Sequence, residues 1–117
     1  MKKVLVDLVV KEVKQVNANC VLLVMASDAA LPPVYPGQFA ELRIDETPTV
    51  MLRRPISVHS FDAEAKEIGF LVQVVGDGTR WLGALKAGDK VNTLLPLGNG
   101  FTMPATAGKR YLLIGGG

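Results

Sequence analysis

Residues 67–85 read EIGFLVQVVGDGTRWLGAL, and this stretch contains the two patterns that decide the fold. Its first part places apolar residues at alternate positions, Ile68, Phe70, Val72 and Val74, which is the period of a β-strand with one face in a core. Residues 79–85 follow a glycine-containing turn and place apolar residues at i, i+1 and i+4, the spacing of a helical stripe. The stretch predicts a strand followed by one short helix, which suits either the closing of a barrel end or a binding role.

The same period of two recurs on both sides of this stretch. Apolar runs near 2–15, 19–26, 38–44, 51–60, 67–76 and 89–95 are separated by turns rich in Asn, Pro, Gly and Asp. Short strands at this spacing are typical of an antiparallel sandwich or barrel. A length of 117 residues with 49% hydrophobic content fits one domain with an ordinary core.

Composition excludes several functional classes. The one cysteine, Cys20, cannot form an internal disulfide, and with the one histidine, His59, it cannot build a Cys/His zinc site. A net charge of +2, from 13 basic and 11 acidic residues, is too balanced to indicate nucleic-acid binding. Charged residues interrupt the first apolar run, so neither a signal peptide nor a membrane span is predicted, and we expect a cytoplasmic protein.

Arginine stands within an apolar strand in the run Arg53-Arg54-Pro55-Ile56-Ser57. Such a charge is costly unless it meets an anion, and a guanidinium offers a planar fork of donors for phosphate oxygens. Strict alternation would place Arg54 and Ser57 on opposite faces, so one shared ligand requires a local break, which Pro55 is suited to provide. The alternative is a surface arginine pair at the start of a strand.

Gly76-Asp77-Gly78-Thr79 supplies a second feature that suits an anion. Glycines allow a phosphate to approach the backbone, the helix start presents free N–H groups, and Thr79 adds a hydroxyl. Gly78 or Thr79 is expected to cap the helix. An ordinary glycine turn is the alternative here, but the two features together favour a diphosphate.

These motifs carry a family resemblance that covers essentially the whole chain. PGQF at 36–39, RPIS at 54–57, GDGT at 76–79 with Leu82 after it, and PLGNGF at 96–101 occur in the order found in the electron-transfer subunit of dihydroorotate dehydrogenase B. The chain resembles the N-terminal half of that subunit, within the ferredoxin-reductase-like flavoprotein superfamily. The resemblance implies an all-β fold, a six-stranded antiparallel Greek-key barrel with one short helix, that binds FAD.

The resemblance also implies roles for individual residues. Arg54 in the segment Arg54-Pro55-Ile56-Ser57 would pair with the pyrophosphate, and Ser57 would lie by the flavin N5 as the catalytic residue. The stretch Leu71, Val72 and Gln73 would line the isoalloxazine edge, and Gly78 and Thr79 would receive the phosphates. Ile56 stands where the wider superfamily prefers tyrosine, which favours the dihydroorotate dehydrogenase subgroup and excludes an aromatic stack there.

A change of character near the end of the chain suggests a second unit. Residues 111–114 form an apolar run without alternation before three glycines, the pattern that opens a parallel nucleotide-binding domain. We therefore expect an FAD-binding barrel over 1–107, and over 108–117 a linker and the first strand of a truncated NAD-binding domain. The cysteines for a 2Fe-2S cluster would lie farther along, so this piece alone is expected to bind FAD without turnover.

The resemblance completes a functional hypothesis. Electrons would pass from NADH, bound through the missing domain, by way of FAD and the downstream 2Fe-2S cluster to an FMN-containing dihydroorotate dehydrogenase catalytic subunit in pyrimidine biosynthesis. One alternative is the flavin domain of a related reductase, such as a sulfide dehydrogenase, or of a hydrogenase subunit. Another is a non-catalytic β-barrel module that binds a flavin or a protein. We further expect Trp81 to anchor the helix, and 96–101 to be mainly structural with a contribution to the flavin site.

Overall fold

A computed structural model describes residues 2–103 and 107–116 of the chain. In this described part, six strands and one helix follow one another: β1 (Val4–Gln15), β2 (Cys20–Ala26), β3 (Phe39–Leu42), β4 (Arg54–Asp62), β5 (Glu67–Gln73), α1 (Asp77–Gly83) and β6 (Lys90–Leu97). All six predicted strands are therefore present. The largest boundary differences are that β4 begins at Arg54 rather than 51 and that β5 ends at Gln73 rather than 76.

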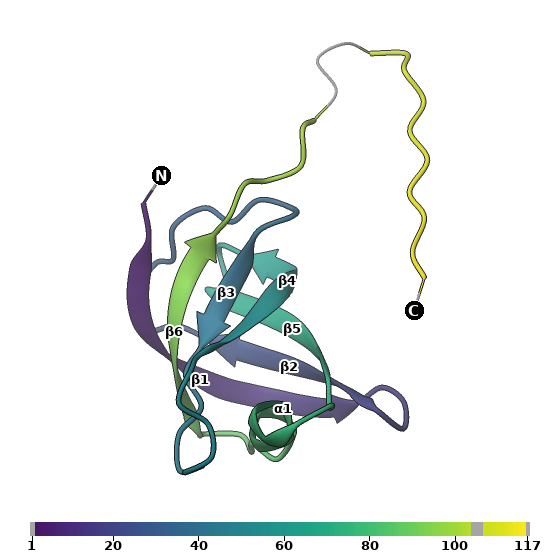
Figure 1. Ribbon diagram of the computed structural model, residues 1–117. Helices are drawn as coiled ribbons and strands as arrows, with labels where there is room; N and C mark the ends of the chain where they lie inside the picture. The colour runs from purple at the N-terminus through teal and green to yellow at the C-terminus, as the bar shows by residue number, and fades with distance from the viewer. Residues whose placement is uncertain (1, 104–106, 117) are drawn as a thin grey trace.

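The strands close into an antiparallel barrel in the order β1-β2-β5-β4-β3-β6, with β6 also paired to β1 (Figure 1). Three consecutive strands, β3, β4 and β5, lie side by side, and β2 returns next to β5, which is the Greek-key order. The structure thus confirms the six-stranded antiparallel barrel with one short helix.

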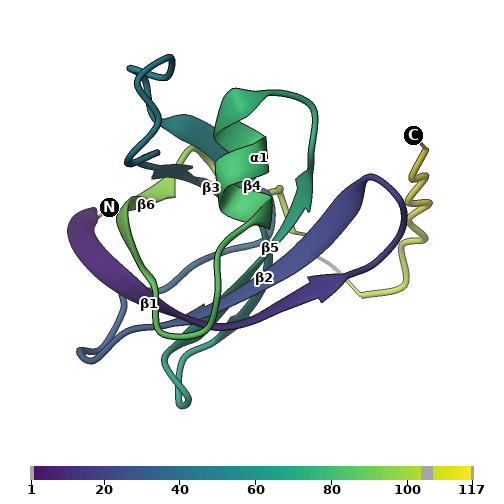
Figure 2. The same cartoon turned by 90° about the horizontal axis from the view of Figure 1, so that it is seen from below.

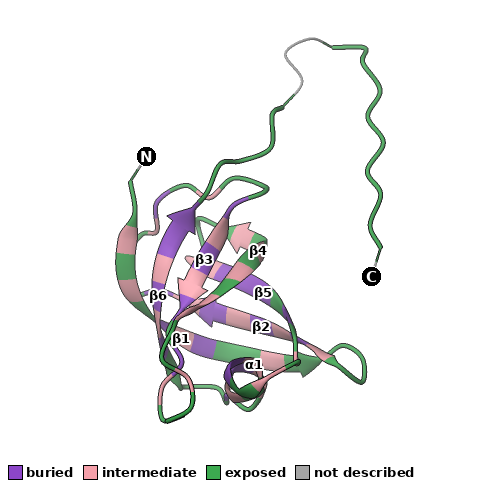
Figure 3. Ribbon diagram, viewed as in Figure 1, coloured by how far each residue is buried: buried purple, intermediate pink, exposed green. Residues whose placement is uncertain are grey.

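Alternation along the strands fills the barrel with apolar side chains. Leu23, Phe70 and Leu95 are fully buried, while their neighbours in sequence are more exposed in most strands (Figure 3). β5 follows the predicted pattern, because Ile68, Phe70 and Val72 all point into the core. The period of two in the sequence is therefore the period of the barrel interior.

Helix α1 lies across one end of the barrel, as the view from below shows (Figure 2). Its Leu82 is fully buried and Trp81 packs against the core, so the expected anchoring role of Trp81 agrees with its position. The helix begins at Asp77 rather than at the predicted 79 because its N-cap is Gly76. Thr79 is the third helical residue, so the prediction that Gly78 or Thr79 caps the helix was wrong. No helix in the described ranges is long and apolar enough to cross a membrane.

The predicted break at Pro55 does not occur. β3 and β4 pair in regular register from Phe39↔Ser57 to Leu42↔Arg54, and the irregularity of β4 lies instead between Val58 and Ser60. Pro55 is accommodated because this part of β4 has no β5 residue in register with it, so the missing N–H breaks no pairing with that strand.

Residues 107–116 form no strand, although 111–114 are predicted to be one. The side chains from Tyr111 to Ile114 are exposed, as the green C-terminal segment in Figure 3 shows. An apolar strand without alternation requires neighbours on both faces, and the barrel supplies none for this segment. The assignment of 108–117 to the start of a second domain stays a prediction.

Candidate functional site

Strands β4 and β5 separate halfway along their length. They pair from Asp62↔Glu67 to Val58↔Phe70. Before Val58, β4 pairs with β3 and not with β5, and beyond Phe70, β5 keeps only the pairing with β2 that runs along its whole length. Figure 1 shows the two strands diverging toward the end of the barrel where α1 lies. We call the unpaired region between residues 54–57 of β4 and residues 71–73 of β5 the β4–β5 seam. It brings together the two stretches that the sequence predicts as a flavin site.

Arg54 lies at the α1 end of the seam, against the backbone of the helix start. A Cβ placed on Gly78 would come 2.8 Å from Arg54 Nε, so the guanidinium side chain covers this buried glycine. Arg54 Nη1 donates to the carbonyl of Leu52 (2.9 Å), and Arg54 forms none of the three ion pairs found among the described residues. Arg54 and Gly78, predicted as separate anion-binding features, are therefore neighbours in space.

Arg53 has a different role, which the sequence did not distinguish. Its Nη1 donates to the carbonyls of Glu41 (3.3 Å) and Asn92 (3.1 Å), and its Nη2 donates to Asn92 Oδ1 (2.5 Å). Asn92 in turn donates to Asp7 Oδ1 (2.9 Å). These bonds connect the start of β4 to β3 and β6, so Arg53 is committed to holding the barrel together.

The remaining predicted residues divide between the two faces of the barrel wall. Ser57 on β4 and Leu71 and Gln73 on β5 are exposed on the outer face. Ile56 packs against the core and Val72 is 1% exposed inside it. Ile56 and Val72 can therefore contribute only backbone groups to a ligand on the outer face, whereas Ser57, Leu71 and Gln73 can contribute side chains.

The Thr79 hydroxyl is already used within the turn that precedes the helix. It accepts the backbone N–H groups of Val75 (2.8 Å) and Gly76 (3.0 Å) and donates to the carbonyl of Gly76 (3.2 Å). The hydroxyl therefore stabilises the turn, and its proton is already donated to the Gly76 carbonyl rather than left for a phosphate. What this segment offers an anion is the backbone at Gly78 and Thr79, whose N–H groups have no acceptor inside the first turn of the helix.

Asp77 places a negative charge in the same turn, but its charge is balanced locally. The Arg80 guanidinium donates to Asp77 Oδ1 (2.6 Å), and the Thr49 hydroxyl donates to Oδ2 (2.9 Å). The hydrogen bond from Arg80, then the one from Thr49, holds the pKa of Asp77 below its ordinary value of 3.8. The bond to Thr49 also fastens the β3–β4 loop, residues 43–53, to α1.

The PGQF and PLGNGF motifs meet at the opposite end of the barrel. The Gln38 amide donates to the carbonyl of Gly98 (2.9 Å), and the N–H of Phe101 donates to the carbonyl of Pro36 (2.8 Å). Gly37 has a φ of +99° and a Cβ there would meet Phe101, so glycine is required on both counts. The expected structural role of 96–101 agrees with these bonds.

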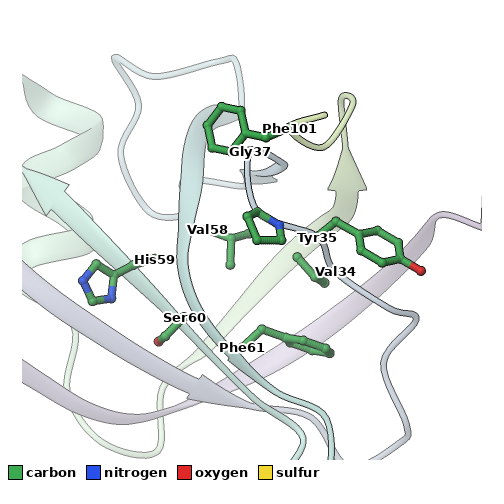
Figure 4. A pocket seen from close by; sticks show the side chains of 9 residues that line it. Val34, Tyr35, Gly37, Val58, His59, Ser60, Phe61 and Phe101 are labelled. Atoms are coloured by element: carbon green, nitrogen blue, oxygen red, sulfur yellow. The ribbon is translucent and has the colours of Figure 1, made fainter. Parts of the chain in front are cut away.

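A pocket of about 430 Å³ opens beside this junction, between the loop before β3 and residues 58–61 of β4. Figure 4 shows Val34 and Tyr35 on the loop side, Phe101 at one end, and His59 projecting to the opposite side of β4 from Val58. The extra β4 residue between Val58 and Ser60 turns both His59 and Ser60 outward. Phe101 belongs to the stretch 96–101, whose contribution to a flavin site stays a prediction. None of the other predicted flavin residues lines this pocket, so it is separate from the seam.

The seam as a whole combines an arginine without a carboxylate partner, an adjacent glycine backbone and an outer wall of mixed polarity. Such a combination suits a phosphate-containing ligand with a flat apolar part. The donors at Arg54 and the helix start suit phosphate oxygens, and Ser57 with the 71–73 backbone offers further polar groups beside them. No cluster of three or more His, Cys, Asp or Glu residues suited to a metal occurs among the residues that the structure describes.

Comparison with known proteins supports this assignment of the fold and adds a family. The chain is 37% identical over 112 residues to the dihydroorotate dehydrogenase B (NAD(+)) electron transfer subunit of Bacillus mycoides (strain KBAB4), an alignment covering 95% of this chain and 43% of that protein. It is 38% identical over 96 residues to the same subunit of Shouchella clausii (strain KSM-K16), covering 81% of this chain and 37% of that protein. No family model matches the chain.

Among solved structures, the ferredoxin reductase in carbazole 1,9a-dioxygenase superposes with a TM-score of 0.79 at 21% identity, covering 92% of this chain and 33% of that one. At this identity the likeness concerns the fold, which is that of the ferredoxin-reductase-type barrel. The chain spans about two-fifths of the length of the curated relatives quoted above.

Proposed function

Because the chain belongs to the family of the dihydroorotate dehydrogenase B electron transfer subunits, we propose that it binds FAD along the β4–β5 seam. The observation that carries the proposal is the placement of Arg54 over Gly78. It sets a charged donor and a glycine backbone side by side, in the region where the seam meets α1. A diphosphate needs both, since it has oxygens on two phosphorus atoms to satisfy.

The electrostatics of the β3–β4 loop and α1 support the same choice. Arg43 and Arg80 each form an ion pair, with Asp45 and Asp77, whereas Arg54 donates to the Leu52 carbonyl and pairs with no carboxylate among the described residues. A partly buried guanidinium without a carboxylate is favourable when an anion completes its hydrogen bonds. The diphosphate of FAD supplies that anion.

The ring end of FAD would lie farther along the seam, beside Ser57. Because β4 is regular here, Arg54 and Ser57 project to opposite faces of the strand, so one FAD would reach both by passing from the outer face through the seam to the helix start. Three residues of strand separate Ser57 from Arg54, a rise of about 10 Å. A ribityl chain with its phosphate spans this distance in an extended conformation. The Ser57 hydroxyl and the backbone of residues 71–73 then face the polar edge of the flavin ring, while Leu71 supplies apolar contact.

The bound flavin would accept a hydride and release single electrons, and the protein's task is to hold and orient it. For the whole protein we propose the relay that the family name implies: electrons from NADH pass through FAD and a 2Fe-2S cluster to an FMN-containing dihydroorotate dehydrogenase catalytic subunit. Support comes from the relatives, which are named as electron transfer subunits of that enzyme. The seam of this chain would serve the FAD step of the relay.

Direct titration with flavins tests the FAD step. Two phosphates at Arg54 and Gly78 should make FAD bind at least about tenfold more tightly than FMN, a gap of about 1.4 kcal/mol. Flavin fluorescence measured against protein concentration gives both affinities. Equal affinities would show that no diphosphate site exists, and the absence of binding by either flavin would refute the proposal.

A further inference from the structure

The C-terminal end of the β3–β4 loop exposes two large apolar side chains next to Arg54. Met51 is 94% exposed and Leu52 is 75% exposed, and they directly precede the arginine pair. Exposed apolar residues beside a cation without a carboxylate partner indicate a ligand with both apolar and anionic parts. The ring and diphosphate of a flavin, as proposed above, leave these two residues uncovered.

This end of the loop is held in position on the protein. The carbonyl of Leu52 accepts the hydrogen bond from Arg54 Nη1 (2.9 Å), so Leu52 is tied to the group that would bind phosphate. Thr49 is bonded to Asp77 on α1 (2.9 Å), and the N–H of Val50 donates to the carbonyl of Thr47 (3.0 Å). Figures 1 and 2 agree that this loop and α1 lie side by side at the same end of the barrel. A loop fixed at these points can act as a preformed contact surface.

The direction of β4 determines which part of a ligand reaches Met51 and Leu52. Ser57 would face the ring and Arg54 the diphosphate, so the chain before Arg54 continues past the phosphates. Leu52 and Met51 lie two and three residues beyond Arg54, at most about 7 to 10 Å of extended chain. An FMN molecule ends at its phosphate and does not extend this far. A dinucleotide carries its second nucleoside in this direction.

We infer that Met51 and Leu52 form the contact surface for the nucleoside beyond the diphosphate and thereby determine the preference for a dinucleotide over a mononucleotide. The inference rests on the proposed FAD site and adds to it the residues that recognise the adenosine half. An adenine ring is flat and largely apolar, which suits a methionine and a leucine side chain. The diphosphate at Arg54 holds the adenine ring close enough to contact Met51 and Leu52.

The test compares Met51→Ser/Leu52→Ser with the wild type for binding of FAD, FMN and ADP. The double variant should bind FAD and ADP about fivefold more weakly, because it loses apolar area that only an adenosine group covers. FMN affinity should stay unchanged. Leu5→Ser, which removes a 61% exposed leucine from β1, is the matched control and should alter none of the three. Thermal unfolding of each variant without ligand checks that the fold is retained.

The outcomes separate this inference from the proposed function. If FAD binds to the wild type and the double variant binds it equally well, the inference is wrong and the FAD site stands. If FAD and FMN affinities fall together, the substitutions disturb Arg54 through the loop, and the specificity role is refuted. If the wild type binds neither flavin, the proposed function itself fails, and the inference fails with it.

Discussion

The side chain of Arg54 lies across the backbone of Gly78, so close that a Cβ on Gly78 would stand 2.8 Å from Nε and 3.1 Å from Cγ of the arginine. Any side chain at position 78 would therefore displace the Arg54 side chain, which comes from another element of the barrel. Because both groups suit phosphate, the contact is the centre of the proposed site rather than a packing detail.

Gly78→Ala should weaken FAD binding without unfolding the protein. The added methyl group displaces the Arg54 side chain from the helix start, and we expect a loss of about tenfold in affinity, or about 1.4 kcal/mol. Alanine is favoured over glycine inside a helix, so the melting temperature should not fall. Fluorescence titration and thermal unfolding measure the two quantities.

Gly76→Ala is the matched control for that substitution. A Cβ on Gly76 meets no atom within 4 Å, and its φ of −160° is an extended conformation open to any residue. FAD affinity should stay near that of the wild type. If both alanine variants lose affinity equally, the turn as a whole matters and the specific contact of Gly78 with Arg54 does not.

Substitution of the two neighbouring arginines should affect different properties, FAD affinity for Arg54 and stability for Arg53. Arg54→Ala removes a charge-assisted contact to the diphosphate and should cost on the order of 1.5–3 kcal/mol of FAD binding, about tenfold to a hundredfold in affinity. Arg53→Ala leaves the carbonyls of Glu41 and Asn92 without this donor and should lower the free energy of unfolding by about 1–2 kcal/mol. Denaturant unfolding and flavin titration of both variants measure the two effects. The assignment is contradicted if Arg53→Ala weakens FAD binding and Arg54→Ala lowers the free energy of unfolding.

Ser57→Ala should change the redox behaviour of the flavin more than its binding. The variant loses one neutral hydrogen bond, so FAD affinity should fall by about 1 kcal/mol or less. The midpoint potential of the bound flavin should shift, because the lost hydroxyl lies near N5 in the proposed arrangement. Ser60→Ala, on the other side of the Val58/Ser60 irregularity, is the control and should leave the potential unchanged. Potentiometric titration distinguishes the two.

The interaction of Asp77 with Arg80 and Thr49 should contribute stability at neutral pH and lose it in acid. The folded-state pKa of Asp77 lies below its ordinary value of 3.8, so the stabilisation is fully present above that value and declines as pH falls through the lower folded-state pKa. Asp77→Asn should therefore be less stable than the wild type at pH 7, with the difference disappearing in strong acid. Unfolding curves of both proteins across this range measure it, and a constant difference would contradict the linkage.

Alternation in the sequence was sufficient to predict the strands but left a sandwich or a barrel open, and the family resemblance was needed to choose the six-stranded barrel. In β5 the apolar residues Ile68, Phe70 and Val72 occupy every second position, and all three are in the core. The helix was also predictable, but its start was not, because the Thr79 hydroxyl bonds back to Gly76 and moves the cap upstream. Side-chain bonds of this kind leave no trace in hydrophobic periodicity.

The candidate site was predictable only as a set of residues. The family motifs identify Arg54, but choosing between Arg54 and Arg53 from physical chemistry alone requires the positions of Glu41 and Asn92, which are distant in sequence. The separation of β4 from β5 depends on which third strand each one joins. Such pairing partners are a property of the topology, and no local pattern encodes them.

The loss of pairing between β4 and β5 at the seam has a consequence for folding cooperativity. Residues 54–57 of β4 pair with β3 and not with β5, whereas β5 pairs with β2 along its whole length. The seam therefore exists only after the barrel has closed, and a flavin bound there would select the fully closed state over every partly assembled one. At a free flavin concentration of about 100 times the dissociation constant, this selection adds about 2.7 kcal/mol to the free energy of unfolding. A bound flavin would then contact both β4 and β5 where they do not pair with each other. It would make the unfolding transition more cooperative as well as raise its midpoint.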